Sequence, residues 1–464
     1  MTQGSGAHGS GKGMGRGSQG YGAWVTKLNT GSGGPVWVLT GDKVETAVNI
    51  AYSCGHFKRF MTVLSLTGLQ DKQHAASRLR QCSDECRDDA SHGLVVDGAS
   101  LVILLECLAE WFYEVCRGCE AVVCCRLSPR QKAEIVKLVK SSRDSPRCAA
   151  VGDGANDVSM LQEAHLGIAP FDYLSPPPAG VMGKEGRQAA RCADVSLAKF
   201  RFLQKVLLVH GHWNYVRMAT FVHFSFYKNV VFNTPMVFYS AWSAFSTQPS
   251  HPPPKQSVYE SFILTVFNIT STTLPVMAYG LFEQDVPPQH LLARPHLYRR
   301  LSRNALLSWK IFLKWILYGL WHASVMYFGL LLACRDDTCG LPGGQTGDLY
   351  LFGVALGTLC TFVVNLKITL EANHYNGVFI LSLIVTALLY ALLYLMYSGI
   401  PTEPFVKYGI YFVYYRLFES PALNLACLLL GVTCLLPDLL DKAYTHITDR
   451  EMKLLMQPDH ALDT

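Results

Sequence analysis

The first half of the chain alternates short apolar runs with segments of helical periodicity. Runs of this length and composition are typical of buried parallel strands. They lie at Val36–Leu39, 94–96, Ala121–Cys125 and Cys148–Val151. Helical patterns follow the first three runs, at residues 44–54, 101–114 and 130–140. Repeated strand–helix alternation predicts an α/β domain built on a doubly wound parallel sheet.

The second half consists of long apolar segments separated by polar loops. Each segment is long enough to cross the roughly 30 Å hydrocarbon core of a bilayer. We place six of them, at residues 216–246, 262–282, 311–333, 349–370, 378–397 and 418–437. This pattern predicts an all-α transmembrane domain of about six helices.

Charge in the loops predicts an orientation for these segments. One loop is rich in arginine, with Arg294, Arg299, Arg300 and Arg303. It lies on the cytosolic side if the α/β domain does, as the positive-inside rule requires. The loop with Asp336 and Asp337 then faces the other side, where Cys334 and Cys339 could pair in an oxidising compartment.

Changes in composition and apolar pattern divide the chain into four parts. Residues 1–35 are rich in Gly and Ser and are predicted to be disordered or an artefact of the gene model. Residues 36–210 form the α/β domain, with a proline-rich insertion at 170–179. Residues 211–437 form the transmembrane domain, and 438–464 a cytosolic tail.

Composition supports the membrane interpretation and excludes nucleic-acid binding. Of 464 residues, 50% are hydrophobic and 16% charged, against about 25% charged in globular domains. The net charge of +5 is mild, and no basic stripe interleaves with aromatic residues. Most of the 15 cysteines fall in apolar runs, as small buried residues do. A zinc site is the alternative for Cys116 and Cys119, but no second pair follows at a suitable spacing.

Three acidic turns follow predicted strands. They contain Asp42, Asp97 and Asp153, and the last belongs to the sequence VGDGANDV, which also supplies Asp157. The carboxyl ends of parallel strands meet at one sheet edge, where such folds bind ligands. Mg²⁺ is usually held by one or two carboxylates together with phosphate. With Lys132 as a nearby cation, the combination predicts a phosphoryl-transfer site.

The motifs in this arrangement resemble those of P-type ATPases. The resemblance rests on Thr40-Gly41-Asp42, on Asp97 and Gly98, on Arg126 with Lys132, and on the GDGAND sequence of residues 152–157. Further motifs resemble the type IV branch, the phospholipid flippases, and lie at residues 39–47, 122–126, 184–186, 209–213 and 226–229. The resemblance covers roughly residues 36–437 and implies a haloacid-dehalogenase-like phosphorylation domain.

The resemblance also implies roles for individual residues. Asp153 and Asp157 would hold Mg²⁺, and Asp42, Lys132 and Asp153 would be the catalytic residues. The phosphates of ATP and the phosphorylated site would be lined by Thr40, Gly41, Asp42, Arg126, Lys132, Asn156 and Asp157. Lys228 and Asn229 would lie along the pathway of the phospholipid headgroup. A two-span accessory subunit of the Cdc50 kind is the implied partner, in the plasma membrane or in Golgi or endosomal membranes.

The role of Lys228 can also be inferred from its position in the apolar segment, without the family resemblance. A lysine inside an apolar segment is costly and by default functional, whereas one near a membrane surface can extend to the headgroups. Lys228 lies about a dozen residues into its segment, roughly 18 Å at the helical rise. That depth favours a functional role for Lys228. Asn365 and Lys367, near a segment end, are interpreted as anchors, and His210 and His212 as packing residues.

Two alternatives stay open. The family's nucleophile is the aspartate of a DKTGT sequence, which does not occur in the chain. In family order, that sequence, the dephosphorylation loop, the nucleotide-binding domain and four spans all precede Val36. The first alternative is therefore a truncated, catalytically inactive membrane protein. The second is a cation-translocating P-type ATPase, which we disfavour because no Asp or Glu lies well inside the six segments.

Overall fold

The computed structural model divides into two compact units, Met1–Gln204 and Lys205–Thr464. The structure describes residues 23–27, 36–86, 91–143, 145–170, 185–243, 258–259, 261–293, 301–335, 349–399 and 411–448. Three expectations lie outside these ranges. They concern the insertion beyond Pro170, the pairing of Cys334 with Cys339, and the arginine-rich loop apart from Arg303.

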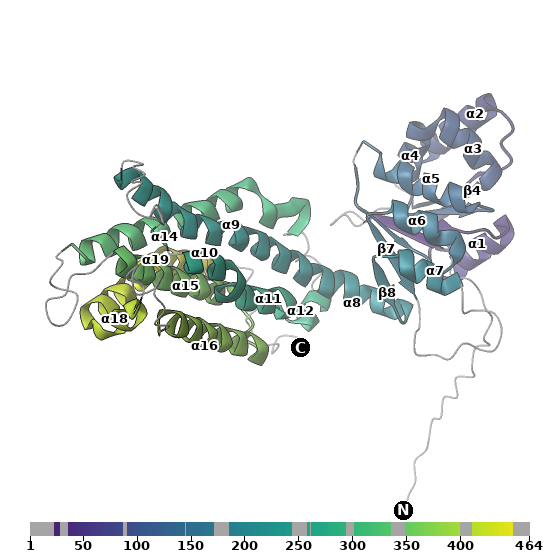
Figure 1. Ribbon diagram of the computed structural model, residues 1–464. Coiled ribbons are helices and arrows are strands. Elements are labelled where there is room, and N and C mark those ends of the chain that lie inside the picture. The colour runs from purple at the N-terminus through teal and green to yellow at the C-terminus, as the bar shows by residue number, and fades with distance from the viewer. Residues whose placement is uncertain are drawn as a thin grey trace, which may run out of the picture. The chain divides into compact units, whose positions relative to one another are not determined.

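The first unit is built on an eight-stranded sheet (Figure 1). Its strand order is β3-β4-β5-β2-β1-β6-β7-β8. The strands are β1 (Ala23–Lys27), β2 (Val36–Leu39), β3 (Thr62–Leu66), β4 (His92–Asp97), β5 (Ala121–Cys125), β6 (Cys148–Val151), β7 (Leu166–Pro170) and β8 (Val195–Leu197). Every neighbouring pair is parallel except the two that involve β1, which runs antiparallel between β2 and β6. A parallel sheet is thus confirmed, with one inverted strand inside it.

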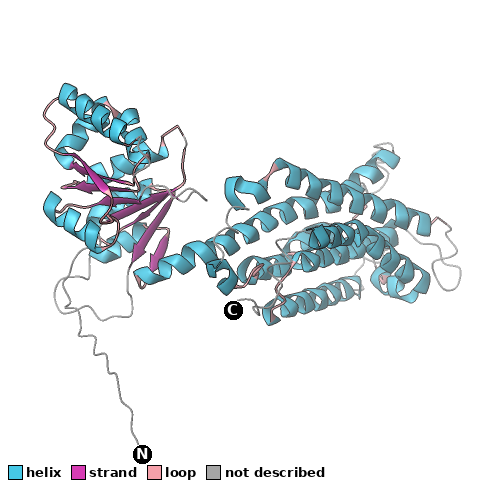
Figure 2. Cartoon of the chain, turned by 180° about the vertical axis from the view of Figure 1, so that it is seen from behind, coloured by secondary structure: helices cyan, strands magenta, loops and turns pink. Residues whose placement is uncertain are grey.

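Helices flank both faces of this sheet, as the cyan and magenta ribbons show in Figure 2. They are α1 (Val44–Ser53), α2 (Lys72–Glu85), α3 (Gly98–Cys107), α4 (Ala109–Arg117), α5 (Pro129–Lys140), α6 (Val158–Glu163) and α7 (Glu185–Cys192). Side chains alternate between the faces of a strand. Accordingly, Trp37 and Leu39 join one apolar cluster with α2 to α7, whereas Val38 joins another with α1. Two-sided burial explains why these strands are apolar throughout.

Several elements differ from the sequence-based expectations. Residues 58–92, where the apolar pattern indicates no strand or helix, contain β3 and α2. Helix α2 buries only Ala75, Leu79 and Cys82, so its apolar stripe is too narrow to stand out in the sequence. The helix predicted at 101–114 breaks at Leu108, which gives α3 and α4. Strand β1 lies within residues 1–35, where no regular structure was expected.

The second unit is a helical bundle. Its longer helices are α9 (Gly211–Trp242), α11 (Thr273–Phe282), α14 (Trp309–Ala333), α15 (Leu349–Glu371), α16 (Gly377–Gly399) and α19 (Pro421–Thr448). Four of them, α14, α15, α16 and α19, are long and apolar enough to cross a membrane, among the helices that the structure describes. Their outward faces carry many exposed apolar side chains, such as Leu388 and Leu428, as lipid contact requires.

The first two predicted spans look different from the other four. The first is the single helix α9, whose polar Lys228, Asn229 and Asn233 lower its hydropathy. The second is divided into α10 (Ser261–Val266), a π-helical turn at Phe267–Ser271, and α11. Thr272 joins the last two with a φ of −134°, well outside the helical region. Ser271 and Thr272 are fully buried, so protein surrounds this break in the helix.

Candidate functional site

The acidic turns of the first unit meet at one edge of the sheet. Strands β4, β5 and β2 are consecutive neighbours and parallel, so their carboxyl ends coincide. Asp97 pairs in register with Cys125 at the end of β5, and Leu39 at the end of β2 pairs with Cys124. The turn after β2 and the turn after β4 therefore emerge on either side of β5.

The turn after β2 is held by its own side chains. The amide of Thr40 donates to the Cys124 carbonyl at 2.9 Å, which extends the β2–β5 ladder by one residue. The Thr40 hydroxyl donates to Oδ2 of Asp42 at 3.0 Å and accepts from the Asp42 amide at 3.2 Å. Gly41 and Asp42 are exposed, so this turn presents backbone and a carboxylate to solvent.

Arg126 is fixed to this turn through its backbone. Its amide donates to the Asp42 carbonyl at 3.0 Å, and the Leu127 amide donates to the Thr40 carbonyl at 3.1 Å. Arg126 adopts a φ of 53°, a left-handed conformation that costs free energy for a residue with a Cβ. A Cβ on Gly98 would lie 2.4 Å from the Arg126 carbonyl oxygen. Gly98 therefore lets the end of β4 approach this loop.

Helix α5 delivers Lys132 to the site. Ser128 and Gln131 form a reciprocal capping box at its start, with Pro129 as the first helical residue. Lys132 lies on the buried face of the helix. Its Nζ donates to Oδ1 of Asp157 at 2.8 Å, and both side chains are less than a tenth exposed.

Asp157 closes the turn that follows β6. Its Oδ2 accepts from the Gly154 amide at 3.3 Å, while Oδ1 receives Lys132. A Cβ on Gly152 would lie 2.5 Å from Cβ of Asp157, so only glycine leaves room for this carboxylate. Asp153 is half-buried in the same turn, and Asn156 is exposed. The structure thus assigns Asp157 a charge partner that the sequence did not pair with it.

The carboxylates suit Mg²⁺ only together with a non-protein ligand. Among the described residues, no group of three or more His, Cys, Asp or Glu side chains could hold a metal by itself. Mg²⁺ accepts one or two carboxylates and completes its shell with water and phosphate. Asp157 is paired with Lys132, and Asp153 lies in the same turn. The donor set fits the metal as a phosphate-assisted site.

The sequence-predicted residues thus form two pairs. Thr40 contacts Asp42, with Arg126 attached through its backbone, and Lys132 contacts Asp157. No hydrogen bond between described side chains joins one pair to the other.

In the second unit, Lys228 points to the break at Thr272. Its Nζ donates to Oγ1 of Thr272 at 3.2 Å, and the side chain is half-buried. The break is also held from α15, where Nδ2 of Asn365 donates to the Ser271 carbonyl at 2.9 Å. Asn229 differs from its neighbour: it is exposed, and its Nδ2 donates to the Ser225 carbonyl of its own helix at 2.9 Å. Lys228 and Asn229 therefore do not share a contact.

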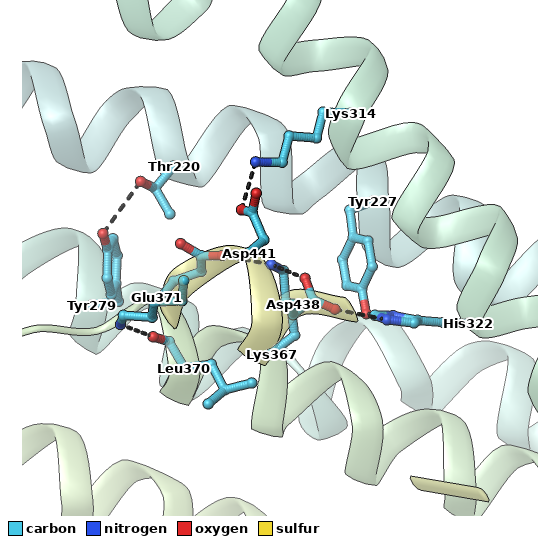
Figure 3. Close-up of polar contacts among 11 residues, drawn as sticks. Thr220, Tyr227, Tyr279, Lys314, His322, Lys367, Leu370, Glu371, Asp438 and Asp441 are labelled. Atoms are coloured by element: carbon cyan, nitrogen blue, oxygen red, sulfur yellow. Dashed lines mark hydrogen bonds and ion pairs between the residues drawn. The ribbon is translucent and has the colours of Figure 1, made fainter. Parts of the chain in front are cut away.

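A buried polar network near these residues was missed in the sequence (Figure 3). Lys367, interpreted as an anchor, is 3% exposed and lies 2.5 Å from both Oδ1 of Asp438 and Oε1 of Glu371. Asp438 was placed in a tail, but α19 continues through it to Thr448. His322, in the middle of an apolar helix, is a signal of such a network, because a polar group there needs a partner.

Two histidines and two cysteines that were weighed as metal ligands make other contacts. His212 lies 2.7 Å from Asp285, and the ring of His210 packs edge-on against Trp213. Cys116 and Cys119 are almost fully buried in the apolar cluster beside α2 to α7. Burial raises the pKa of both thiols well above the ordinary value, which disfavours the thiolate that binds zinc.

Comparison with known proteins places this geometry in a family. Residues 190–450 match the family described as phospholipid-translocating P-type ATPase C-terminal. Phospholipid-transporting ATPase IH of Homo sapiens is 39% identical over 88% of this chain and 36% of its own length. Phospholipid-transporting ATPase IG of Homo sapiens is 34% identical over 87% of this chain and 37% of its own length. Probable phospholipid-transporting ATPase 5 of Arabidopsis thaliana is 35% identical over 74% of this chain and 28% of its own length.

The match to human ATPase IH thus spans little more than a third of that relative's length. The family match alone covers more than half of the chain and includes α14, α15, α16 and α19, the four helices able to cross a membrane. Together these observations identify an integral membrane protein, and the chain belongs to the phospholipid-translocating P-type ATPases.

Proposed function

We propose that this chain supplies the Mg²⁺-phosphate turn and the late membrane helices of an ATP-driven phospholipid translocase. The enzyme would pass through an aspartyl-phosphate and move phospholipid from the exoplasmic to the cytosolic leaflet. The observation that carries the proposal is the Lys228 ammonium, which lies inside a long helix and donates to Thr272 at a helix break. A cation beside unwound backbone can receive a phosphate or carboxylate of a lipid headgroup.

The first unit supports the phosphoryl half of this proposal. We propose a haloacid-dehalogenase-like domain in which Asp153 holds Mg²⁺ and Asp157 completes the turn and positions Lys132. When bound, the metal would offset charge on the transferred phosphoryl group. Thr40, Gly41, Asp42, Arg126 and Asn156 would line the phosphates. Gly41 and Asp42 suit this role because both are exposed at the carboxyl edge of the sheet.

The second unit supports the lipid half. We propose six spans, in which α9 and the divided helix α10–α11 join the four apolar helices. These two elements are the ones that carry Lys228 and its partner Thr272, so their polarity has a functional explanation. Asn229 would meet the headgroup from the exposed side of α9. A Cdc50-type subunit and a plasma, Golgi or endosomal membrane complete the proposal, with the first unit in the cytosol.

Cation transport is less well supported by the bundle. The expectation that no carboxylate lies inside the spans was wrong for Asp438, which is buried in α19. However, Lys367 lies 2.5 Å from that carboxylate and His322 lies 2.9 Å from it. A carboxylate already neutralised in this way is not available to replace the hydration shell of a transported cation.

The second candidate is a membrane protein that binds Mg²⁺ or phospholipid without turnover. The observation in its favour is that the printed sequence contains no DKTGT. Sequencing the transcript upstream of the codon for Val36 separates the two. A continuous coding sequence that contains DKTGT would favour turnover by the gene product. Its absence, with phospholipid binding by the chain intact, would favour the second candidate.

Phospholipid binding itself is tested with a matched pair of lysines. Lys228→Met should raise the half-maximal concentration of a photoactivatable phosphatidylserine for labelling the chain in phosphatidylcholine nanodiscs by about tenfold. Lys314→Met is the control, because Lys314 is 45% exposed and paired with Asp441. It should change the value less than twofold. Equal effects of both substitutions would contradict a headgroup site at Lys228.

A further inference from the structure

Four helices of the second unit are joined by one chain of buried polar side chains (Figure 3). The Tyr227 hydroxyl lies 2.6 Å from Nδ1 of His322, and Nε2 of His322 lies 2.9 Å from Oδ2 of Asp438. Oδ1 of Asp438 lies 2.5 Å from Nζ of Lys367. These residues come from α9, α14, α19 and α15, and each is less than a tenth exposed. Removing any member would leave a buried polar group unpaired.

The donor and acceptor groups of these four side chains determine where the protons of the network lie. A carboxylate can only accept, so Nε2 of His322 carries the proton that faces Asp438. In the neutral imidazole, Nδ1 then accepts from the Tyr227 hydroxyl. Asp438 is neutralised by Lys367, whose ammonium also lies 4.4 Å from the centre of the Trp315 ring. Every member has a polar neighbour in this network, with the approach of His322 Nε2 to Asp438 Oδ2 an ion-pair distance of 2.9 Å without hydrogen-bond geometry.

Tyr227 fixes the rotation of α9 about its own axis. It is fully buried against α14, where Gly319 allows close packing: a Cβ there would lie 3.1 Å from Val230 and 3.5 Å from Tyr227. Consecutive residues of an α-helix point about 100° apart. The bond from Tyr227 to His322 therefore determines where the next side chain, Lys228, points.

The network of Tyr227, His322, Asp438 and Lys367 also holds Thr272, the partner of Lys228. On α15, Asn365 precedes Lys367 by two residues and donates to the Ser271 carbonyl at 2.9 Å. Ser271 is followed by Thr272, whose hydroxyl accepts from Lys228 at 3.2 Å. The contact between Lys228 and Thr272 is thus held by α9 on one side and α15 on the other, and Tyr227, His322, Asp438 and Lys367 link these two helices.

We propose that Tyr227, His322, Asp438 and Lys367 are positioning residues that set Lys228 against the helix break for binding of a phospholipid headgroup. This inference rests on the proposed role of Lys228. None of the four residues would touch the lipid. They would act by holding α9 and α15 in one relative setting, so their loss would weaken headgroup binding without removing any group that contacts it.

Tyr227→Phe is the test variant, because it deletes only the hydroxyl. Tyr390→Phe is its matched control: Tyr390 is also buried, and its hydroxyl lies 2.9 Å from Oγ1 of Thr358, a bond between α16 and α15. His322→Gln is a second variant that keeps an amide donor in the place of Nε2 but has no acceptor at the position of Nδ1, where the Tyr227 hydroxyl lies. Binding is measured with photoactivatable phosphatidylserine in phosphatidylcholine nanodiscs, and folding is checked by thermal unfolding.

Lys228 itself provides a readout that a purely structural role would not move. Acylation of Lys228 by a membrane-permeant amine-reactive ester is followed by mass spectrometry, with Lys314 as the internal reference. Tyr227→Phe and His322→Gln should each weaken binding about fivefold and change the Lys228 acylation rate relative to Lys314. The double variant should be no weaker than either single variant, because both remove the same link.

The outcomes separate this inference from the proposed function. If Lys228→Met weakens binding but Tyr227→Phe matches Tyr390→Phe, the positioning role is wrong and the headgroup site stands. If Tyr227→Phe weakens binding and Lys228→Met does not, both are wrong, because positioning must act through Lys228. A lower unfolding temperature for both tyrosine variants, with unchanged Lys228 acylation, would also overturn the positioning role.

Discussion

Nζ of Lys132 lies 2.8 Å from Oδ1 of Asp157, and the two side chains are 9% and 6% exposed. This pair joins α5 to the turn that follows β6. Two opposite charges taken out of water depend on each other, because either one alone would be left unpaired in a poorly solvated site. The pair is therefore both the centre of the proposed phosphate site and a stability determinant of the first unit.

Removing the lysine of this pair should destabilise the first unit strongly. We expect Lys132→Met to lower the free energy of unfolding by about 3–5 kcal/mol. Lys58→Met is the control, since Lys58 and Glu120 form an ion pair of the same length, 2.8 Å, with side chains 45% and 48% exposed. It should cost less than about 1 kcal/mol. Urea unfolding, with hydrogen exchange of the β6 amides as the readout, measures the free energy of unfolding of both variants. Similar losses of stability in Lys132→Met and Lys58→Met would contradict the role of burial.

Gly98 should not tolerate a methyl group. A Cβ there would lie 2.4 Å from the backbone oxygen of Arg126, which cannot rotate away, so the loop carrying Arg126 must shift. We expect Gly98→Ala to destabilise the unit by about 1–3 kcal/mol. Gly41→Ala, where the nearest atom is 3.9 Å away, should leave stability nearly unchanged. The urea midpoints of the two variants decide this, and a destabilised Gly41→Ala would refute the steric explanation.

Alkaline pH should weaken the sheet through its buried thiols. Burial, with smaller contributions from Asp97 and Asp42, raises the pKa of Cys125 from 9.0 to about 11. Between these values the unfolded chain releases the thiol proton while the folded chain retains it, so stability falls as pH rises from 9 to 11. Cys125→Ala should flatten this decline in urea midpoint, and Cys54→Ala, at an exposed site, should not. Identical slopes would contradict the assignment.

Asp153 should govern the response of the first unit to Mg²⁺. A ligand that binds the folded state raises stability, by about 2.7 kcal/mol at a hundredfold excess over its dissociation constant. We expect Mg²⁺ with inorganic phosphate to raise the unfolding temperature of the chain, and Asp153→Asn to abolish that rise. Asp71→Asn, at an exposed helix start, serves as control. A retained rise in Asp153→Asn would show that the metal binds elsewhere.

The sequence was a good guide wherever an element is apolar throughout. Strands β2, β5 and β6 are continuous apolar runs because both faces of the sheet are covered, and they were located correctly. Helix α2 was missed because it is polar and buries only three residues. Strand β1 was missed because the order of strands in space, not local composition, makes a position available between β2 and β6.

Long-range pairings limited the prediction of the sites. The residues of the phosphate edge could be named from their motifs, yet the bond from Lys132 to Asp157 spans 25 positions and has no local signal. Thr272 was not singled out, because a hydroxyl in an apolar segment is common. The apolar pattern ends at Pro437 and so predicts a tail from Asp438 onward, whereas α19 continues past this proline.

The proposed role of Lys228 is tested most directly by mapping where a phospholipid headgroup contacts the chain. The chain is placed in nanodiscs with a phosphatidylserine that carries its photoreactive group on the headgroup, and the cross-linked residues are identified by mass spectrometry. We expect cross-links concentrated at Lys228 and Asn229 and at the break at Ser271 and Thr272. Cross-links spread over the outward faces of α16 and α19, with none near Lys228, would contradict a headgroup site in this bundle.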